Sequence, residues 1–585
     1  MNSELRQRIR TAHHRVSQAL RSELAPSGHW EGTLSSSALA TATAVTALAT
    51  VGRVTDGELV RNGLRWLADH ANADGGWGDT VRSRSNLSTT ALAWAAFGAA
   101  GADEAFAPTV TNALRYLRIT AGGIEAIVPA IEALYGKDRT FSVPITMTLA
   151  LSGRLEPDGW KQVRPLPFEL AALPRGLFGA LRLPVVSYAL PALIAIGQVI
   201  HQRSGRFNPL RSLTRHRTLS VLTTLQPTNG GFLEATPLTS FVTMSLAGMG
   251  LPDHRVARRG ARFLRHSVRA DGSWPIDTNL ATWGTTLAIK ALRHNPDDLT
   301  PAQRDALRAW LLGQQYRAVH PYTGAAPGGW AWTDLPGGVP DADDTAGALL
   351  ALRHLARPDQ ATLEAGALGA EWLLGLQNRD GGIPTFCRGW GTLPFDRSTP
   401  ELTAHARRAW NAWLPDLPPN LAARVQVASL KAERFLTGNQ RTDGAWLPLW
   451  FGNEAAPDQV NPVYGTAQVL LGTEAVPSLR AARDRGLSFL AGQQNADGGW
   501  GGAQGAPSTM EETALSLEAL ADADVPAPQE ALERGARWLV RAVEECRWRE
   551  PAPIGLYFAR LWYFEQLYPL VFATSALGKL VAMND

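Results

Sequence analysis

The stretch Phe489 to Trp500 reads FLAGQQNADGGW: the end of a helix-like segment, a Gln-bearing turn, two glycines and an aromatic residue. Asp followed by Gly-Gly closes a helix and lets the chain reverse. Related stretches lie at residues 62–77, 259–274, 372–383 and 435–446, and looser copies at 222–232 and 310–315, the last reaching Trp330 after a longer loop. Self-similarity of this kind is the signature of a stacked repeat architecture.

The segments between the repeats are rich in Ala and Leu at helical spacing, as in TTALAWAAFGAAG (89–101) and GALLALRHLA (347–356). Strand signals are nearly absent. The sequence therefore predicts an all-α fold of helical hairpins stacked in a ring or solenoid. Most of the 20 Trp residues belong to the repeats, so we interpret them as structural rather than chemical.

Composition excludes several classes of protein. The chain has 585 residues, of which 45% are hydrophobic and 19% charged, which is typical of globular domains and not of a disordered chain. A net charge of +3 is too small to suggest nucleic-acid binding. Two cysteines exclude a disulfide scaffold and a cysteine-rich zinc protein. No apolar run is long enough to predict a membrane-spanning helix.

The acidic hexapeptide DADDTA, residues 341–346, is the most unusual local feature. Three carboxylates before an apolar helix are also what helix capping favours. Calcium binding is a second interpretation, but an EF-hand loop needs Gly at its sixth position and Glu at its twelfth, where this chain has Ala346 and Leu352. A third reading is catalysis: crowded carboxylates do not all ionise, and a protonated one in a water-poor pocket is a proton donor. Trp330 and Trp332 lie just before the cluster.

Together, the Gln–Trp repeats and the DADDTA motif resemble the squalene–hopene cyclase family of class II terpene cyclases. The resemblance covers nearly the whole chain and implies two α-barrel domains with a large cavity between them. Residues 25–280 would form a γ-type barrel. Residues 281–585, completed by the N-terminal helix 1–24, would form a β-type barrel that carries the acid.

The resemblance implies that Asp343 is the general acid that protonates a terminal alkene, with Asp341 and Asp344 as its neighbours in the motif. The family pairs this acid with a His in a [DE]-x-T-A-H segment, which here is residues 401–405. His405 would orient and strengthen Asp343. Alkenes are very weak bases, so a partner that stabilises the resulting carboxylate is a physical requirement.

A migrating carbocation needs aromatic faces, which stabilise it without trapping it. Motif-level matches suggest the following cavity residues: Trp283, Trp332, Phe386 and Trp450, and near the C-terminus Tyr557, Phe564 and Leu561, the last where an aromatic is common. Core packing is the alternative role for each of the aromatics. Two stretches depart from the family pattern: FCRGWGTLPFD (386–396) replaces an acidic segment, and the loop after Trp450 is longer.

We expect squalene as the substrate and a polycyclic triterpene such as hopene or hopanol as the product. Another polyprene of C15–C35, a prenyl diphosphate or a meroterpenoid precursor is the alternative. No cofactor is implied, and Mg²⁺ only for a diphosphate, for which we see no specific motif. Two other classes stay open: an α/α-barrel glycoside hydrolase using Asp343 with Glu401, and a non-catalytic helical scaffold.

Residues 165–200 are apolar but interrupted by prolines, at positions 165, 167, 174, 184 and 191. This pattern fits a segment that dips into one leaflet of a membrane, and also a buried helical hairpin. Four arginines could meet anionic headgroups: Arg164, Arg175, Arg182 and Arg203. The resemblance implies attachment to the cytoplasmic face of the cell membrane, with substrate entry near this segment, and it suggests a homodimer.

Overall fold

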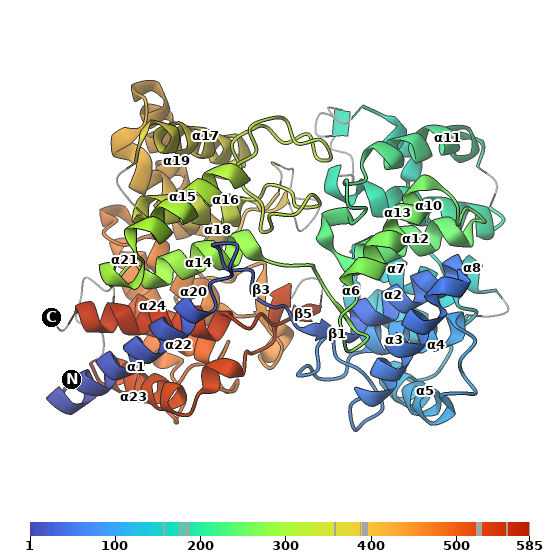
Figure 1. Ribbon diagram of the computed structural model, residues 1–585, viewed down its shortest axis with the longest axis horizontal. Helices are drawn as coiled ribbons and strands as arrows, with labels where there is room; N and C mark the ends of the chain where they lie inside the picture. The colour runs from blue at the N-terminus through green and yellow to red at the C-terminus, as the bar shows by residue number, and fades with distance from the viewer. Residues whose placement is uncertain are drawn as a thin grey trace.

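The computed structural model describes residues 1–155, 158–174, 177–178, 181, 187–206, 208–355, 358–386, 388, 396–521, 529–556 and 560–583. Helices dominate, which confirms the all-α prediction. They form two lobes side by side, joined by extended segments (Figure 1). One hydrophobic core is built from residues 38–276, and the other from Leu5–Trp30 and Trp283–Leu580.

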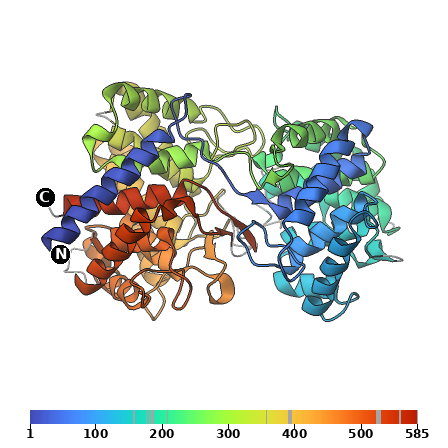
Figure 2. The ribbon, with the colours of Figure 1, turned by 60° about the horizontal axis from the view of Figure 1, so that its bottom comes forward.

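The C-terminal lobe is a double ring of helices. Its inner ring consists of α14 (Ala281–Leu292), α16 (Ala342–Leu355), α18 (Pro400–Trp413), α20 (Pro462–Gly472), α22 (Met510–Ala521) and α24 (Tyr568–Ala582), each packed on the next and α24 on α14. Its outer helices are α15 (Pro301–Gln314), α17 (Gln360–Leu376), α19 (Pro419–Gly438), α21 (Arg480–Gly492), α23 (Gln529–Glu544) and α1 (Ser3–Ser22). Helix α1, from the other end of the chain, lies against α23 and α24 (Figure 2).

The N-terminal lobe repeats this plan. Its inner helices are α2 (Ala38–Val51), α4 (Leu87–Ala99), α7 (Arg139–Leu151), α10 (Leu190–Arg203) and α12 (Thr236–Gly248), with α12 closing the ring against α2. The outer helices are α3 (Gly57–Asp69), α5 (Ala107–Ala121), α6 (Ile127–Tyr135), α8 (Gly159–Gln162), α11 (Pro209–Thr224) and α13 (Arg255–Ser267).

Short strands and 3-10 turns connect the helices. Strand β1 (Ser36–Ser37) pairs with β2 (Trp274–Pro275), and β3 (Phe451–Asn453), β4 (Ile554–Leu556) and β5 (Leu561–Tyr563) form an antiparallel sheet where the lobes meet. The 3-10 turns are η1 (Val54–Asp56), η2 (Phe168–Ala172), η3 (Ser187–Ala189), η4 (Phe232–Glu234), η5 (Pro296–Asp298), η7 (Leu414–Asp416), η8 (Pro457–Gln459), η9 (Pro477–Leu479) and η10 (Arg547–Arg549). The backbone N–H of Trp562 donates to Asp79 across this seam (2.8 Å).

Each repeat is a hydrogen-bonded joint between three helices. In the copy at 489–500, Nε2 of Gln494 donates to Gly498 (2.8 Å) and to Ala531 on the next outer helix (2.9 Å). The indole of Trp500 donates to Leu490 (2.7 Å), and its backbone N–H donates to the hydroxyl of Thr513 on an inner helix (2.9 Å). Buried polar groups must be paired, so this pattern fixes how the helices stack.

The first glycine of the Gly-Gly pair is required by backbone geometry. Gly498 has a φ of +93°, in the left-handed region that glycine adopts at no steric cost. A Cβ there would lie 3.0 Å from the carbonyl oxygen of Arg534. The turn therefore brings two helices closer together than any other residue would allow.

Candidate active site

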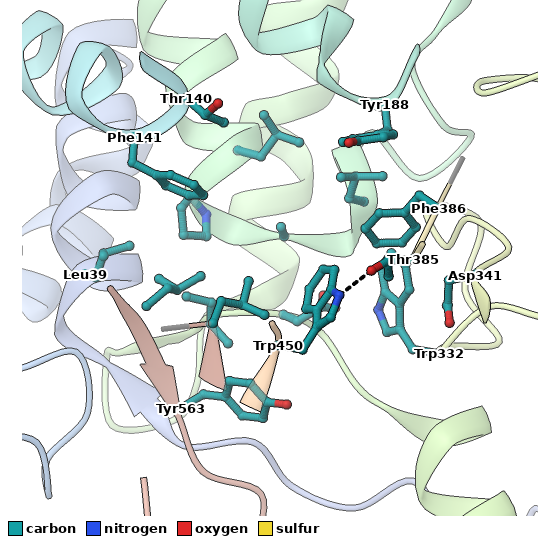
Figure 3. A pocket seen from close by; sticks show the side chains of 18 of the residues that line it. Leu39, Thr140, Phe141, Tyr188, Trp332, Asp341, Thr385, Phe386, Trp450 and Tyr563 are labelled. Atoms are coloured by element: carbon teal, nitrogen blue, oxygen red, sulfur yellow. Dashed lines mark hydrogen bonds between the residues drawn. The ribbon is translucent and has the colours of Figure 1, made fainter. Parts of the chain in front are cut away.

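A cavity of about 370 Å³ lies between the two barrels, at the end where the inner helices of both begin. The first turns of α2, α7, α12, α14, α16, α18 and α24 all contribute to its wall. Its lining is mostly apolar and aromatic (Figure 3). Among the described lining residues, the charged type is aspartate alone, and neither Lys nor Arg is present.

The DADDTA motif is placed by its threonine. The hydroxyl of Thr345 accepts the backbone N–H of Trp330 (3.0 Å), the same joint that Thr513 makes in its repeat. Oδ1 of Asp341 accepts the N–H of Asp344 (2.9 Å) and so caps the start of α16. With the helix anchored on both sides, Asp343 reaches the cavity from its first turn.

His405 lies against Asp343. Its Nδ1 is 2.6 Å from Oδ1 of Asp343, and both side chains are about one-fifth exposed. Thr403 anchors α18 through the N–H of Ile383 (2.8 Å), as Thr345 anchors α16. The two threonines thus occupy equivalent positions on adjacent inner helices, and Asp343, two residues before one of them, meets His405, two residues after the other.

Burial keeps the neighbouring acids from ionising easily. It raises the pKa of Asp341 to about 7, and it raises the pKa of Asp344 well above its ordinary value, helped by the charge of Asp341. It also raises the pKa of Glu401 to about 7. Glu401 accepts the N–H of Leu449 (2.9 Å) and does not line the cavity, so it is not placed to act with Asp343 on a bound sugar.

Aromatic rings surround the space in front of Asp343. Phe386 is central: its ring centroid lies 6.1 Å from Trp332, 5.6 Å from Trp450 and 5.2 Å from Tyr188. Trp283 also lines the cavity, and its indole donates to the hydroxyl of Tyr568 (3.0 Å). These rings offer the faces that a carbocation needs, and the indole N–H groups of Trp283 and Trp450 are satisfied by hydrogen bonds.

The aromatic segment near the C-terminus is offset from our expectation by one residue. Leu561 and Tyr563 line the cavity, whereas Phe564 is buried outside the lining, under the guanidinium of Arg82 at 5.4 Å. Successive side chains of a strand point to opposite faces, so β5 presents Leu561 and Tyr563 to the cavity. Tyr557 lies outside the described residues.

Only part of the apolar segment 165–200 is exposed and available for contact with a membrane. Residues 190–200 belong to α10, an inner helix with a largely buried apolar surface. Arg164 pairs with Glu132, and Arg203 donates to the carbonyl of Gly248, while Arg175 and Arg182 lie outside the described residues. Among the described residues of this segment, the exposed leucines are Leu173, Leu177 and Leu181. In the described part of the chain, no helix has the length and apolarity needed to span a bilayer.

Sequence reasoning missed several lining residues. Tyr188, Tyr563 and Tyr568 add phenol rings to the wall, and Asp277 adds a carboxyl from the link between the barrels. The alternation of β5 was the available signal for Tyr563. No sequence signal pointed to Asp277, because the residues around it in the structure, such as Ala235, lie far from it in the sequence.

Known proteins share parts of this chain. A squalene–hopene cyclase of Bradyrhizobium diazoefficiens is 29% identical over 49% of this chain and 47% of its own length. A drimenyl diphosphate synthase of Streptomyces showdoensis is 36% identical over 34% of each chain. The chain thus spans about half or less of these curated relatives.

An ent-copalyl diphosphate synthase structure from Streptomyces platensis matches 99% of this chain and 100% of its own, with a TM-score of 0.59 and 19% identity, and so shares the fold. The family models of the squalene–hopene cyclase N-terminal and C-terminal domains match residues 14–210 and 279–582, the latter more than half of the chain. The chain therefore belongs to the squalene–hopene cyclase family of class II terpene cyclases.

Proposed function

We propose that the protein cyclises a neutral linear polyprene, with squalene as the substrate and a polycyclic triterpene as the product. The observation that carries this proposal is the Asp343–His405 pair, which opens into an aromatic cavity with no cationic side chain among its described lining residues. A hydrocarbon chain needs no cationic partner, and the described part of this wall offers none.

Asp343 starts the reaction by giving its proton to a terminal alkene. The π electrons form the new C–H bond, and the positive charge remains on the more substituted carbon. The proton comes from the carboxyl oxygen that His405 does not bind. His405 and the positive end of the α16 dipole then stabilise the carboxylate that is left, which makes Asp343 a stronger acid.

The aromatic wall guides the remaining steps. Each cation–π contact is worth on the order of 0.5–2 kcal/mol, enough to favour one folded conformation of the chain over others. Ring closures move the charge away from Asp343 along the cavity. The cation is finally quenched by loss of a proton or by water.

A prenyl diphosphate is the second candidate substrate, because the chain is 36% identical to a drimenyl diphosphate synthase over 204 residues. A diphosphate is highly charged and needs cationic side chains or Mg²⁺. Since neither Lys nor Arg lines the described cavity, its diphosphate would have to lie outside the wall seen here. Turnover that requires Mg²⁺ would identify this substrate class.

A membrane-dissolved substrate also needs a route to the site. We propose that the exposed leucines 173, 177 and 181 rest in the outer part of one leaflet, so that squalene enters without crossing water. Flotation of the wild type and of a Leu173→Ser, Leu177→Ser, Leu181→Ser variant with liposomes tests this. Equal flotation of the two proteins would contradict it.

The function itself is tested by incubating the full chain with squalene and with shorter polyprenes, with and without Mg²⁺, and analysing the products by gas chromatography–mass spectrometry. We expect cyclic triterpenes from the wild type, and a loss on the order of 10³-fold in Asp343→Asn. Asp484→Asn, on the exposed side of α21, is the matched control and should retain full activity. Equal product from Asp343→Asn would refute the mechanism.

A further inference from the structure

Asp277 is a carboxyl in the cavity wall that the mechanism above does not use. It follows β2 and precedes α14, in the segment that links the two barrels, and its side chain lines the cavity. Its backbone pairs with that of Ala235 from the N-terminal barrel. The residue is thus held by both barrels, apart from the acidic motif on α16.

The surroundings of Asp277 are those of a functional group rather than of a surface charge. Its Oδ1 accepts the N–H of Thr278 (2.7 Å). Burial and the nearby carboxyl of Glu234 raise its pKa well above the ordinary value, while the indole of Trp332 favours the ionised form. Asp277, Trp332 and Asp343 all line the same cavity.

Glu234 does not compete for the substrate. Its Oε1 accepts the side-chain amide of Asn229 and the N–H of Gly337, both at 2.6 Å, and its Oε2 accepts the hydroxyl of Thr278 (3.2 Å). It is fully buried and is not part of the cavity wall. Of the two carboxyls, Asp277 alone lines the cavity.

We propose that Asp277 is the base that ends the cyclisation, by taking a proton from the carbon next to the final carbocation. The C–H bond breaks, its two electrons form the new C=C bond, and the proton passes to the carboxylate of Asp277. Asp343 has given one proton and Asp277 has received one, so substrate and product are isomers. This inference rests on the proposed function and names the step that the function leaves open.

The proton has a short way out. Thr278, the next residue, is exposed to solvent, and its hydroxyl lies within 3.3 Å of the backbone oxygen of Glu234. Water next to the exposed Thr278 can take up the proton from Asp277, and Asp343 regains its proton from water. No co-reactant beyond water is needed.

Product analysis tests the assignment. Asp277→Asn keeps the size of the side chain and an acceptor for Thr278, but it cannot take up a proton. We expect substrate consumption within about threefold of the wild type and an alkene-to-alcohol product ratio that falls by about tenfold or more, because water then quenches the cation. Asp277→Glu should restore part of the ratio, which a purely structural role would not explain. Asp334→Asn, an exposed neighbour outside the wall, is the matched control. An unchanged ratio in Asp277→Asn would overturn the proposal.

A binding measurement separates this proposal from the proposed function. N,N-dimethyldodecylamine carries a cation on an apolar chain, and quenching of tryptophan fluorescence reports its binding. We expect about tenfold weaker binding by Asp277→Asn than by the wild type and by Asp334→Asn. If no polyprene is turned over but this difference is found, the substrate is wrong and Asp277 still faces a cation. Equal affinities in all three proteins would rule out Asp277 whatever the substrate is.

Discussion

The two barrels share a scaffold and differ in what the first turns of their inner helices carry. In the C-terminal barrel, α16, α18 and α22 have carboxyl side chains in their first turns, among them Asp343, Glu401 and Glu511. In the N-terminal barrel, none of α2, α4, α7, α10 and α12 has an acid there. Their cavity ends present apolar and hydroxyl side chains instead, such as Leu39, Thr140 and Leu238.

This difference indicates that the shared fold positions the side chains, whereas the residues in the first turns determine which of them are acidic. The inner helices whose first turns line the cavity point the positive ends of their dipoles toward it, where they favour a carboxylate. Only one barrel uses that opportunity. The other leaves a hydrocarbon wall, which can shape a substrate chain but cannot start its reaction.

The largest effect is expected at the pair that makes the C-terminal end reactive. His405→Ala removes the partner of the Asp343 carboxylate, so kcat should fall on the order of 100-fold. The KM should stay within about twofold, because His405 does not line the cavity. Steady-state kinetics with the accepted polyprene measures both. The exposed His216→Ala is the control, and a kcat within threefold of the wild type would speak against the pairing.

Burying acids at this end should make stability depend on pH. Burial, assisted by Glu512, raises the pKa of Glu511 to about 8. In the unfolded chain the same group titrates near about 4.3. Between these values the folded protein holds a proton that the unfolded chain has lost, so the free energy of unfolding falls as pH rises.

Glu511→Gln should remove this share of the slope, on the order of 3–4 kcal/mol between pH 5 and pH 8. The amide oxygen can keep the bond from the N–H of Ala552 (2.8 Å). Urea unfolding at the two pH values measures the difference, with the exposed Glu530→Gln as control. A slope as steep in Glu511→Gln as in the wild type would contradict the prediction.

At the apolar end, a change of shape should alter selectivity rather than rate. Ala192 on α10 lines the cavity, and Ala192→Phe fills part of it. We expect kcat/KM for a long polyprene to fall about tenfold relative to a shorter one, since a lost apolar fit is worth about 1–3 kcal/mol. Competition between two chain lengths measures the ratio. Ala481→Phe, on the exposed face of α21, should leave it unchanged.

What the sequence predicts follows the repeat. Asp343 lies two residues before the threonine that anchors its helix, and His405 lies two residues after the equivalent threonine, so the position of each in the repeat can be read from its motif. The resemblance of the C-terminal aromatic segment to that of the family predicts Phe564 in the wall, but it does not determine whether Tyr563 or Phe564 points to the cavity. For residues 190–200, the sequence does not distinguish a buried helix from a segment that dips into a membrane, because both have the same apolar composition. The role proposed for Asp277 depends on groups from both barrels that lie far from it in the sequence.

The smallest effect is expected for the repeat glutamines, whose loss should destabilise both barrels equally. Gln226 bridges Gly230 and Val256 in the N-terminal barrel, as Gln494 bridges Gly498 and Ala531 in the C-terminal one. Each amide makes two hydrogen bonds, so Gln226→Ala and Gln494→Ala should each lower the free energy of unfolding by about 1–2 kcal/mol.

Urea unfolding followed by tryptophan fluorescence compares the two variants with Gln360→Ala, whose amide bonds only to Glu364 on the exposed face of α17. Equal losses in the two repeat variants, and almost none in the control, would mean that the barrels are alike as structures. The difference between the barrels would then lie in the first turns of their inner helices. A loss confined to one barrel would instead mean that the scaffold itself differs, and that the acids of α16, α18 and α22 are not the whole distinction.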